Sequence, residues 1–155
     1  MKTHEIHCLQ QLPIDTATAW EFFSNPWNLS KITPPKMKFR VTNAPETKIH
    51  AGMIITYSVS PLLGIPTGWV TEITHLREGE YFVDEQRVGP FKLWHHEHHF
   101  RPTNDGVEIE DRVSYIMPFG ALGELVHRAY VHAELQHIFA HRRGVLEQLF
   151  KKHRE

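Results

Sequence analysis

Apolar and polar residues alternate along the middle of the chain, with the period of two that is typical of β-strands with one buried face. The alternation predicts a first strand at residues 1–12 and six further strands at residues 39–41, 53–59, 68–76, 81–88, 92–101 and 107–117. Short links with turn residues, such as Glu78-Gly79 and Gly89-Pro90, separate them. Links of this length favour antiparallel hairpins over the crossovers that parallel strands need.

Two short helices are expected between the first strand and the others. Asp15 or Thr16 can cap the first helix, whose apolar pattern stops at Asn25-Pro26. The second helix covers residues 27–31, and Pro34-Pro35 ends helical structure because prolines lack the backbone donor.

After Pro118 the apolar spacing lengthens to three and four residues, which predicts one long helix over residues 121–152 with Gly144 as its weak point. The stripe expected to be buried consists of Val131, Leu135, Ile138, Phe139, Leu146, Leu149 and Phe150. The order of elements predicts an α+β fold in which a curved antiparallel sheet of about seven strands wraps around the C-terminal helix. With 155 residues, the chain (residues 1–155) is expected to be a single domain.

The composition narrows the class of function. The formal charge is -1 with neutral His, and Lys and Arg are scattered, which argues against nucleic acid as a partner. Cys8 is the only cysteine, so no intrachain disulfide can form. No segment resembles a signal peptide or the roughly 20 apolar residues of a membrane span, so a cytoplasmic protein without stable membrane insertion is expected.

The stretch from Phe91 to Phe100, FKLWHHEHHF, carries the main chemical signal. Successive side chains of a strand point to opposite faces, so Trp94, His96, His98 and Phe100 share one side. The Trp and Phe mark this side as buried, and two imidazoles are then drawn inside, where they need hydrogen-bond partners.

In the neighbouring strands the apolar residues also mark the buried side. Four polar residues share that side with them and would face Arg142 on the long helix: Thr71, Asp84, Gln86 and Asp111. Loops that keep parity place Asp84 opposite His96 and His98 opposite Asp111. Each imidazole would then lie within reach of a carboxylate, which raises the pKa of the imidazole and lowers that of the acid.

Two interpretations of this polar set stay open. The groups can be structural pairs that satisfy one another, or they can converge on a hollow interior that holds a small ligand. A metal site is also conceivable, but His95 and His99 point away and no further ligand is placed by the sequence, so neither metal nor cofactor is expected. His137 and His141, four apart on the long helix, are more simply explained by a solvated face.

The order of elements and several motifs resemble the SRPBCC superfamily, the START or Bet v 1-like helix-grip fold. The resemblance rests on Asn28-Leu29, Ile32-Thr33-Pro34-Pro35, Gly64-Ile65-Pro66, Trp69, Thr71, the run from Phe82 to Gln86, Gly89-Pro90-Phe91, Trp94, His96, His98, Phe100, Asp111, Val113, Tyr115, Leu135, Ile138, Phe139 and Arg142. It is similar in particular to bacterial ligand-binding or polyketide cyclase/dehydrase-like members, and it implies a cavity between sheet and helix without implying a reaction.

Three hypotheses about function follow. The first is a module that binds a hydrophobic or aromatic small molecule, lipid-like or polyketide-like, in an internal cavity. Its expected contacts are Tyr57, Trp69, Thr71, Phe82, Asp84, Gln86, Trp94, His96, His98, Phe100, Asp111, Tyr115, Leu135, Phe139 and Arg142, with Trp20 and Phe23 as further wall residues. The second is a cyclase or dehydratase, with His96, His98, Asp84 and Asp111 as candidate proton-transfer groups. The third is an interaction domain whose interior is packed.

Overall fold

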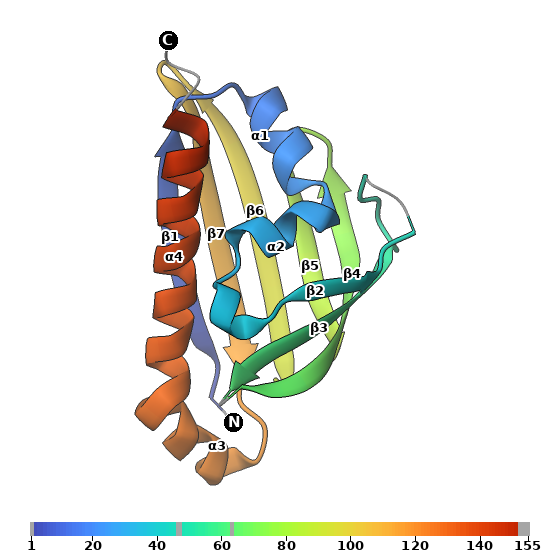
Figure 1. Ribbon diagram of the computed structural model, residues 1–155, viewed down its shortest axis with the longest axis vertical. Helices are drawn as coiled ribbons and strands as arrows, with labels where there is room; N and C mark the ends of the chain where they lie inside the picture. Colours follow the sequence, from blue (N-terminus) through green and yellow to red (C-terminus); the bar gives the residue numbers. More distant parts are fainter. Residues whose placement is uncertain (1, 46–47, 63, 152–155) are drawn as a thin grey trace.

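The computed structural model describes residues 2–45, 48–62 and 64–151, with residues 61 and 62 described by their backbone alone. Its centre is one antiparallel sheet of seven strands in the order β1-β7-β6-β5-β4-β3-β2 (Figure 1). The strands are β1 (His4–Leu12), β2 (Arg40–Asn43), β3 (Ile54–Leu62), β4 (Ile65–Arg77), β5 (Tyr81–Val88), β6 (Leu93–Thr103) and β7 (Gly106–Ile116). Strands β2 to β7 form a meander, and β1 closes the far edge by pairing with β7.

The helices cover one face of this curved sheet (Figure 1). They are α1 (Thr16–Phe23), the 3-10 turn η1 (Pro26–Asn28), α2 (Leu29–Ile32), the 3-10 turn η2 (Pro35–Met37), α3 (Gly120–Val126), the π-helical segment η3 (His127–Val131) and α4 (His132–Phe150). Asp15 caps α1 by accepting a hydrogen bond from the backbone N–H of Thr18 at 2.7 Å, as its position before the apolar run predicts. The predicted helix-grip architecture is therefore confirmed.

The C-terminal helix differs from the sequence-based expectation in one respect. It is helical throughout Gly120–Phe150, but His127–Val131 has π-helical hydrogen bonding. A π turn carries an extra residue and shifts the phase of the side chains that follow. Residue 152, the expected end of the helix, lies outside the described residues.

The apolar stripe of this helix is not uniformly buried. Val131, Leu135, Leu146 and Phe150 are buried, whereas Leu149 is 39% exposed, so its predicted burial is wrong. Ile138 and Phe139 are half-buried: they pack against the smaller of two apolar clusters on the sheet and also line a cavity.

The buried side chains form two clusters at different places along the sheet. The larger contains Leu12, Trp20 and Leu146, and the smaller contains Ile6, Tyr115 and Val131. Trp20, expected in a cavity wall, packs edge-on against Phe82 and Phe100 in the larger cluster, with ring centroids 5.9 and 5.5 Å apart.

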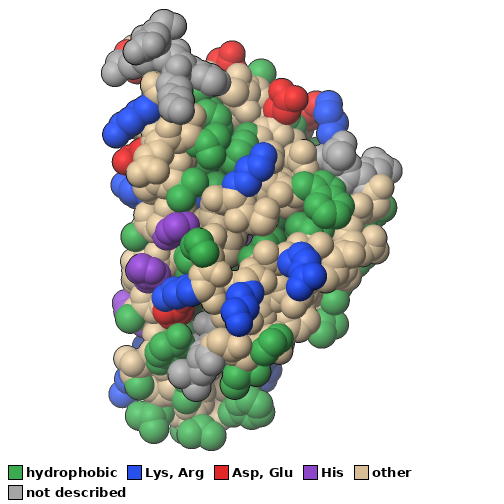
Figure 2. All heavy atoms as spheres, in the orientation of Figure 1, with side chains coloured by type: hydrophobic (Ala, Val, Ile, Leu, Met, Phe, Trp, Pro, Cys, Tyr) green, Lys and Arg blue, Asp and Glu red, His purple; other side chains and the backbone are tan. Residues whose placement is uncertain are grey.

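The surface seen in Figure 2 carries scattered Lys and Arg side chains, with apolar side chains gathered at its lower end over α3. Phe119, Leu122, Leu125 and Val126 are the exposed apolar residues of that segment. Among the helices of the described residues, none has the length and apolar character needed to cross a membrane.

Candidate functional site

A cavity of about 210 Å³ lies between the sheet, the α1–η2 segment and α4. Its walls are mainly aromatic and aliphatic, and they include Ile55 from the larger apolar cluster and Leu135 from the smaller one. Lys36 of η2 forms an ion pair with Glu134 of α4, Nζ to Oε1 2.8 Å, which ties the covering segment to the helix at the cavity wall. The interior is hollow, as one of the two interpretations of the inward polar set requires.

Most of the predicted contact residues line this cavity. They are Tyr57, Trp69, Thr71, Phe82, Asp84, Trp94, His96, His98, Leu135, Phe139 and Arg142. Those on the strands converge because alternate side chains of each strand point to the face that the helix covers, as the sequence pattern predicts.

Four predicted contact residues do not line the cavity, each for its own reason. The Gln86 side chain closes the β5–β6 loop, donating to the backbone carbonyl of Phe91 at 2.7 Å. Phe100 packs within the larger apolar cluster, against Trp20. Asp111 lies behind the imidazoles, and Tyr115 turns to His127, with 2.8 Å between its hydroxyl and the His127 Nε2.

Phe23 lines the cavity as expected, but the sequence reasoning missed most other wall residues of the covering segment, the neighbouring strands and the C-terminal helix. The missed wall residues include Phe22, Asn25, Asn28, Leu29, Ile32, Thr33, Met37, Phe39, Ile49, Ile55, Val59, Ile73, Pro90, Phe91, Met117, Val131, Glu134 and Ile138. The short helices were predicted, but nothing in their spacing shows which side faces the sheet. The only signal in the sequence for this part of the wall was the apolar residues of the two short helices and of the segment that leads to Pro35.

The predicted strand registers are confirmed. Asp84 lies opposite His96, and His98 lies opposite Asp111. The shortest hydrogen bonds, however, run diagonally: His98 Nε2 donates to Asp84 Oδ2 at 2.7 Å, and His96 Nε2 donates to Asp111 Oδ1 at 3.0 Å. The two rings are in contact at a tilt of 35°, with centroids 3.7 Å apart, and Phe82 stacks on His98 at 4.1 Å.

Asp111 is the centre of this cluster. Its Oδ1 lies 3.0 Å from His96 Nε2, 3.0 Å from His98 Nδ1 and 3.0 Å from Arg142 Nη2. An ionised carboxylate accepts hydrogen bonds, and His96 Nε2 donates one to this oxygen, whereas His98 Nδ1 and Arg142 Nη2 approach it as ion-pair contacts without hydrogen-bond geometry. Asp111 thus positions three groups at the cavity wall without touching the cavity itself.

The charges differ between the two imidazoles. Burial, reinforced by the charge of His98, lowers the pKa of His96. Burial also opposes protonation of His98, but hydrogen bonds to Asp111 and Asp84 outweigh it and raise the pKa of His98. Burial opposes ionisation of both carboxyls, yet Arg142 and the imidazoles hold the pKa of Asp111 well below its usual range, and His98 lowers the pKa of Asp84.

The two imidazoles therefore differ in how readily they take up a second proton. His96, whose pKa is lowered, holds its single proton on Nε2, whereas His98, whose pKa is raised, is the ring that more readily becomes an imidazolium between the two carboxylates. The Nδ1 of His96 is then an unprotonated base, 3.7 Å from Asp84 Oδ2. An acid, His98, and a base, His96, lie side by side in an apolar wall.

Asp84, His96 and His98 also lie close enough together to be considered as metal ligands, with one atom from each within 4.8 Å of the others. Both nitrogens of His98 already face carboxylates, and the guanidinium of Arg142 adds a positive charge beside them. This arrangement favours proton transfer or binding of a hydrogen-bond acceptor over binding of a divalent cation.

Comparison with known proteins gives the fold. No protein-family model matches the chain, and no curated protein sequence matches it. TTHA0849 from Thermus thermophilus has a similar structure, with a TM-score of 0.71 at 16% identity over 98% of this chain and 100% of that chain. Ginseng major latex-like protein 151 from Panax ginseng gives 0.69 at 14% identity, covering 96% and 97%.

A third structure, that of Ara h 8.0201, has a TM-score of 0.64 at 14% identity and covers 94% of this chain and 98% of that chain. Likeness at these identities establishes a shared fold. It confirms the helix-grip architecture that the resemblance to the SRPBCC superfamily implies.

Proposed function

We propose that this protein binds a small, mostly apolar organic molecule in the cavity between sheet and α4. The observation that carries the proposal is the hollow itself: about 210 Å³ with apolar walls and one compact polar cluster. Apolar walls supply affinity, at about 25 cal/mol per Å² of surface removed from water, and a few convergent polar groups orient the molecule.

The size of the cavity limits the ligand. Pockets for drug-sized molecules usually measure about 300–1,000 Å³, and a water molecule takes about 30 Å³ of liquid volume. A cavity of about 210 Å³ lies below the range for drug-sized molecules and favours a small molecule, such as a single substituted ring. Longer lipid-like or polyketide-like molecules would extend beyond the cavity through its open side.

The polar cluster favours a ligand that carries a hydrogen-bond acceptor. Arg142 is buried at the cavity wall, and its Nε has no hydrogen-bond partner among the described residues. Its guanidinium lies 5.1 Å from the ring centroid of Phe23, which leaves an aromatic surface beside the free donor. A carbonyl or carboxylate oxygen attached to an aromatic ring satisfies both features.

Tryptophan fluorescence tests this proposal, since Trp69 and Trp94 line the cavity. We expect saturable quenching by small aromatic ketones and carboxylic acids, and weaker quenching by hydrocarbons of equal size. Arg142→Met should weaken binding of the acids and ketones by at least about tenfold while leaving the hydrocarbons unchanged, because only the acceptor loses a partner.

Two controls accompany the measurement. Arg142→Lys keeps the positive charge and should restore part of the affinity, and His137→Ala on the exposed face of α4 should change nothing. Absence of saturable binding for every compound in the panel, in protein shown to be folded, would rule the proposal out.

Acid–base catalysis on the bound molecule is the second candidate function. His96, with a lowered pKa, and His98, with a raised pKa, supply the base and the acid that a cyclase or dehydratase needs. In that case His96→Asn should abolish turnover of a bound carbonyl compound while its binding persists. Cytoplasmic location and the absence of a nucleic-acid partner stay predictions from the sequence.

A further inference from the structure

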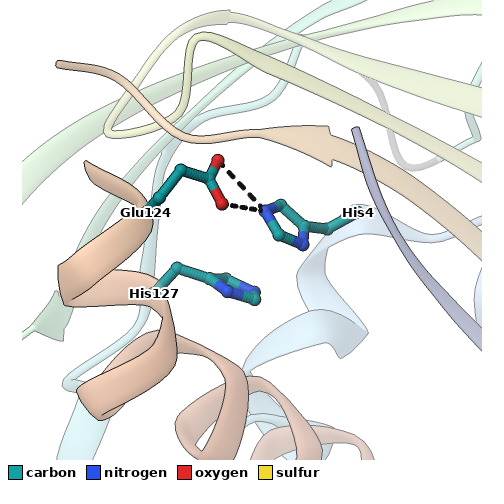
Figure 3. Close-up of side chains that lie close together, drawn as sticks. All are labelled: His4, Glu124 and His127. Carbon is teal, nitrogen blue, oxygen red and sulfur yellow. Dashed lines mark hydrogen bonds and ion pairs between the residues drawn. The ribbon is translucent and has the colours of Figure 1, made fainter. Parts of the chain in front are cut away.

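A second group of imidazole and carboxylate side chains lies outside the cavity. It consists of His4 on β1, Glu124 on α3 and His127 at the start of η3 (Figure 3). None of the three lines the cavity. They meet because β1 pairs with β7, and α3 follows β7 after a short turn at residues 117–119.

The three side chains are in direct contact. His4 Nε2 lies 3.0 Å from Glu124 Oε2 and 3.2 Å from Oε1, and the His4 ring stacks on the His127 ring with centroids 3.7 Å apart. One nitrogen or oxygen from each residue lies within 4.8 Å of the other two. Donor atoms from different elements thus converge on one place.

His127 is the informative member of the group. Only 6% of its surface is exposed, yet its Nδ1 has no hydrogen-bond partner within the part of the chain that the structure describes. Buried polar atoms nearly always have a hydrogen-bond partner, and a buried imidazole nitrogen without one can indicate a bound ion.

The other nitrogen of His127 is held in the manner of a metal ligand. Its Nε2 lies 2.8 Å from the hydroxyl of Tyr115, which is itself buried. If Nε2 carries the proton and donates to this oxygen, Nδ1 keeps its lone pair. Metal-binding histidines commonly donate their second N–H in this way, which fixes the tautomer and the ring orientation.

The local sequence and backbone agree with this role. Glu124 and His127 are three residues apart, which puts both on one face of the helix, and Glu-x-x-His is a spacing used in metal-binding helical bundles. The π-helical segment begins at His127, and π turns occur frequently at functional sites.

We propose that His4, Glu124 and His127 bind a divalent transition-metal ion, with Zn²⁺ as the best match to two imidazole nitrogens and one carboxylate. Three protein ligands leave the fourth position of a tetrahedral ion for water or another small ligand. Glu124 has a 22% exposed side chain and gives the ion a way in. Binding requires the stacked rings to rotate apart, so that both nitrogens approach within about 2.1 Å of the ion.

The site would connect the first strand to the C-terminal helix at the cavity. Val131, the last residue of η3, and Met117, the first residue after β7, both line the cavity. A bound ion would therefore fix the segment that forms one end of the ligand-binding space.

Zinc and cobalt binding to the untagged protein tests the proposal. We expect one equivalent of Zn²⁺ in competition with a chromophoric chelator, a rise in Tm with zinc, and visible absorption bands when Co²⁺ is bound. Glu124→Gln, His4→Gln and His127→Ala should each weaken zinc binding by at least about tenfold, and Tyr115→Phe should weaken it to a smaller extent.

Two matched controls separate this site from other imidazoles. His137→Ala removes an exposed histidine, and His98→Asn breaks the cavity cluster; both should retain one tight equivalent of Zn²⁺. Circular dichroism checks that each variant is folded, and the two conservative Gln variants serve if His127→Ala is not. Retention of tight binding in both Gln variants, its loss in His98→Asn, or no tight equivalent in the unaltered protein would overturn the proposal.

Discussion

At the scale of single residues, two neighbouring imidazoles have pKa values shifted in opposite directions by their surroundings. His98 has a carboxylate at each nitrogen, whereas His96 has one close carboxylate and a positively charged neighbour. Both are buried, so burial alone does not distinguish them. The arrangement of Asp84 and Asp111 decides which ring keeps the second proton.

This difference predicts how stability depends on pH. His96 has a lowered pKa in the folded protein, so the unfolded chain takes up its proton first and stability falls as pH drops below the unfolded value of about 6.5. His98 has a raised pKa, so its contribution is fully present below about 6.5 and is lost as pH rises through its folded pKa. His96→Asn should therefore flatten the loss of stability between about pH 6.5 and 5.

Urea unfolding at a series of pH values measures this effect. The variant His98→Asn should instead remove stability that the unaltered protein has near pH 6, and the exposed His137→Ala should leave the slope unchanged. A slope between pH 6.5 and 5 that is the same with and without His96 would show that this imidazole is not held neutral. The folded charge states themselves can be checked by imidazole ¹⁵N chemical shifts.

Sequence reasoning reached this cluster because the side-chain period of a strand is two, and any error of one residue would have turned the whole set outward. The hydrogen bond from the Gln86 side chain to the backbone carbonyl of Phe91 was not predicted, because side-chain to backbone bonds in a turn leave no periodic signal in the sequence. His4 and Glu124, 120 positions apart, were missed for a similar reason. Their contact depends on how α3 lies against the start of β1.

At the scale of elements, two of the glycines in the C-terminal helix have opposite surroundings. An added Cβ at Gly144 would meet no atom within 4 Å, whereas at Gly123 it would collide with the backbone carbonyl of Pro118. Glycine in a helix is less stable than alanine because it loses more backbone freedom on folding.

Gly144→Ala should accordingly raise the free energy of unfolding by about 0.5–1 kcal/mol. Gly123→Ala, its counterpart in α3, should lower it by at least about 2 kcal/mol, since backbone must move to admit the methyl group. Chemical denaturation of the two variants gives both numbers. Destabilisation by Gly144→Ala would mean that the helix packs more tightly there than the structure shows.

The elements themselves were largely predictable. Alternation and turn residues located every strand of the meander, with ends displaced by a few residues, as for β4, which begins at Ile65 instead of residue 68. The π turn was not predictable, because neither composition nor spacing marks it. The π turn ends at Val131, which packs with Ile6 of β1 and with Val113 and Tyr115 of β7 in the smaller apolar cluster.

At the scale of the whole molecule, the cavity exists because the side chains of the sheet and those of the helices that cover it do not fill the space between them. The sheet curves around α4, and the α1–η2 segment bridges the opening without filling it (Figure 1). The cavity volume is the small difference between two larger volumes: the space enclosed by the sheet and the helices, and the side chains that fill most of it. For that reason the sequence could indicate a cavity through its inward polar residues but could not give its size.

Native mass spectrometry of the protein, purified without detergent and then mixed with small aromatic acids and ketones, tests the central claim most directly. The account predicts a one-to-one complex with at least one compound, or with a molecule carried through purification. It also predicts loss of the acid and ketone complexes in Arg142→Met and their persistence in His137→Ala. A folded protein that forms no such complex, or forms it equally well in both variants, would contradict the claim that this cavity and its polar cluster bind a ligand.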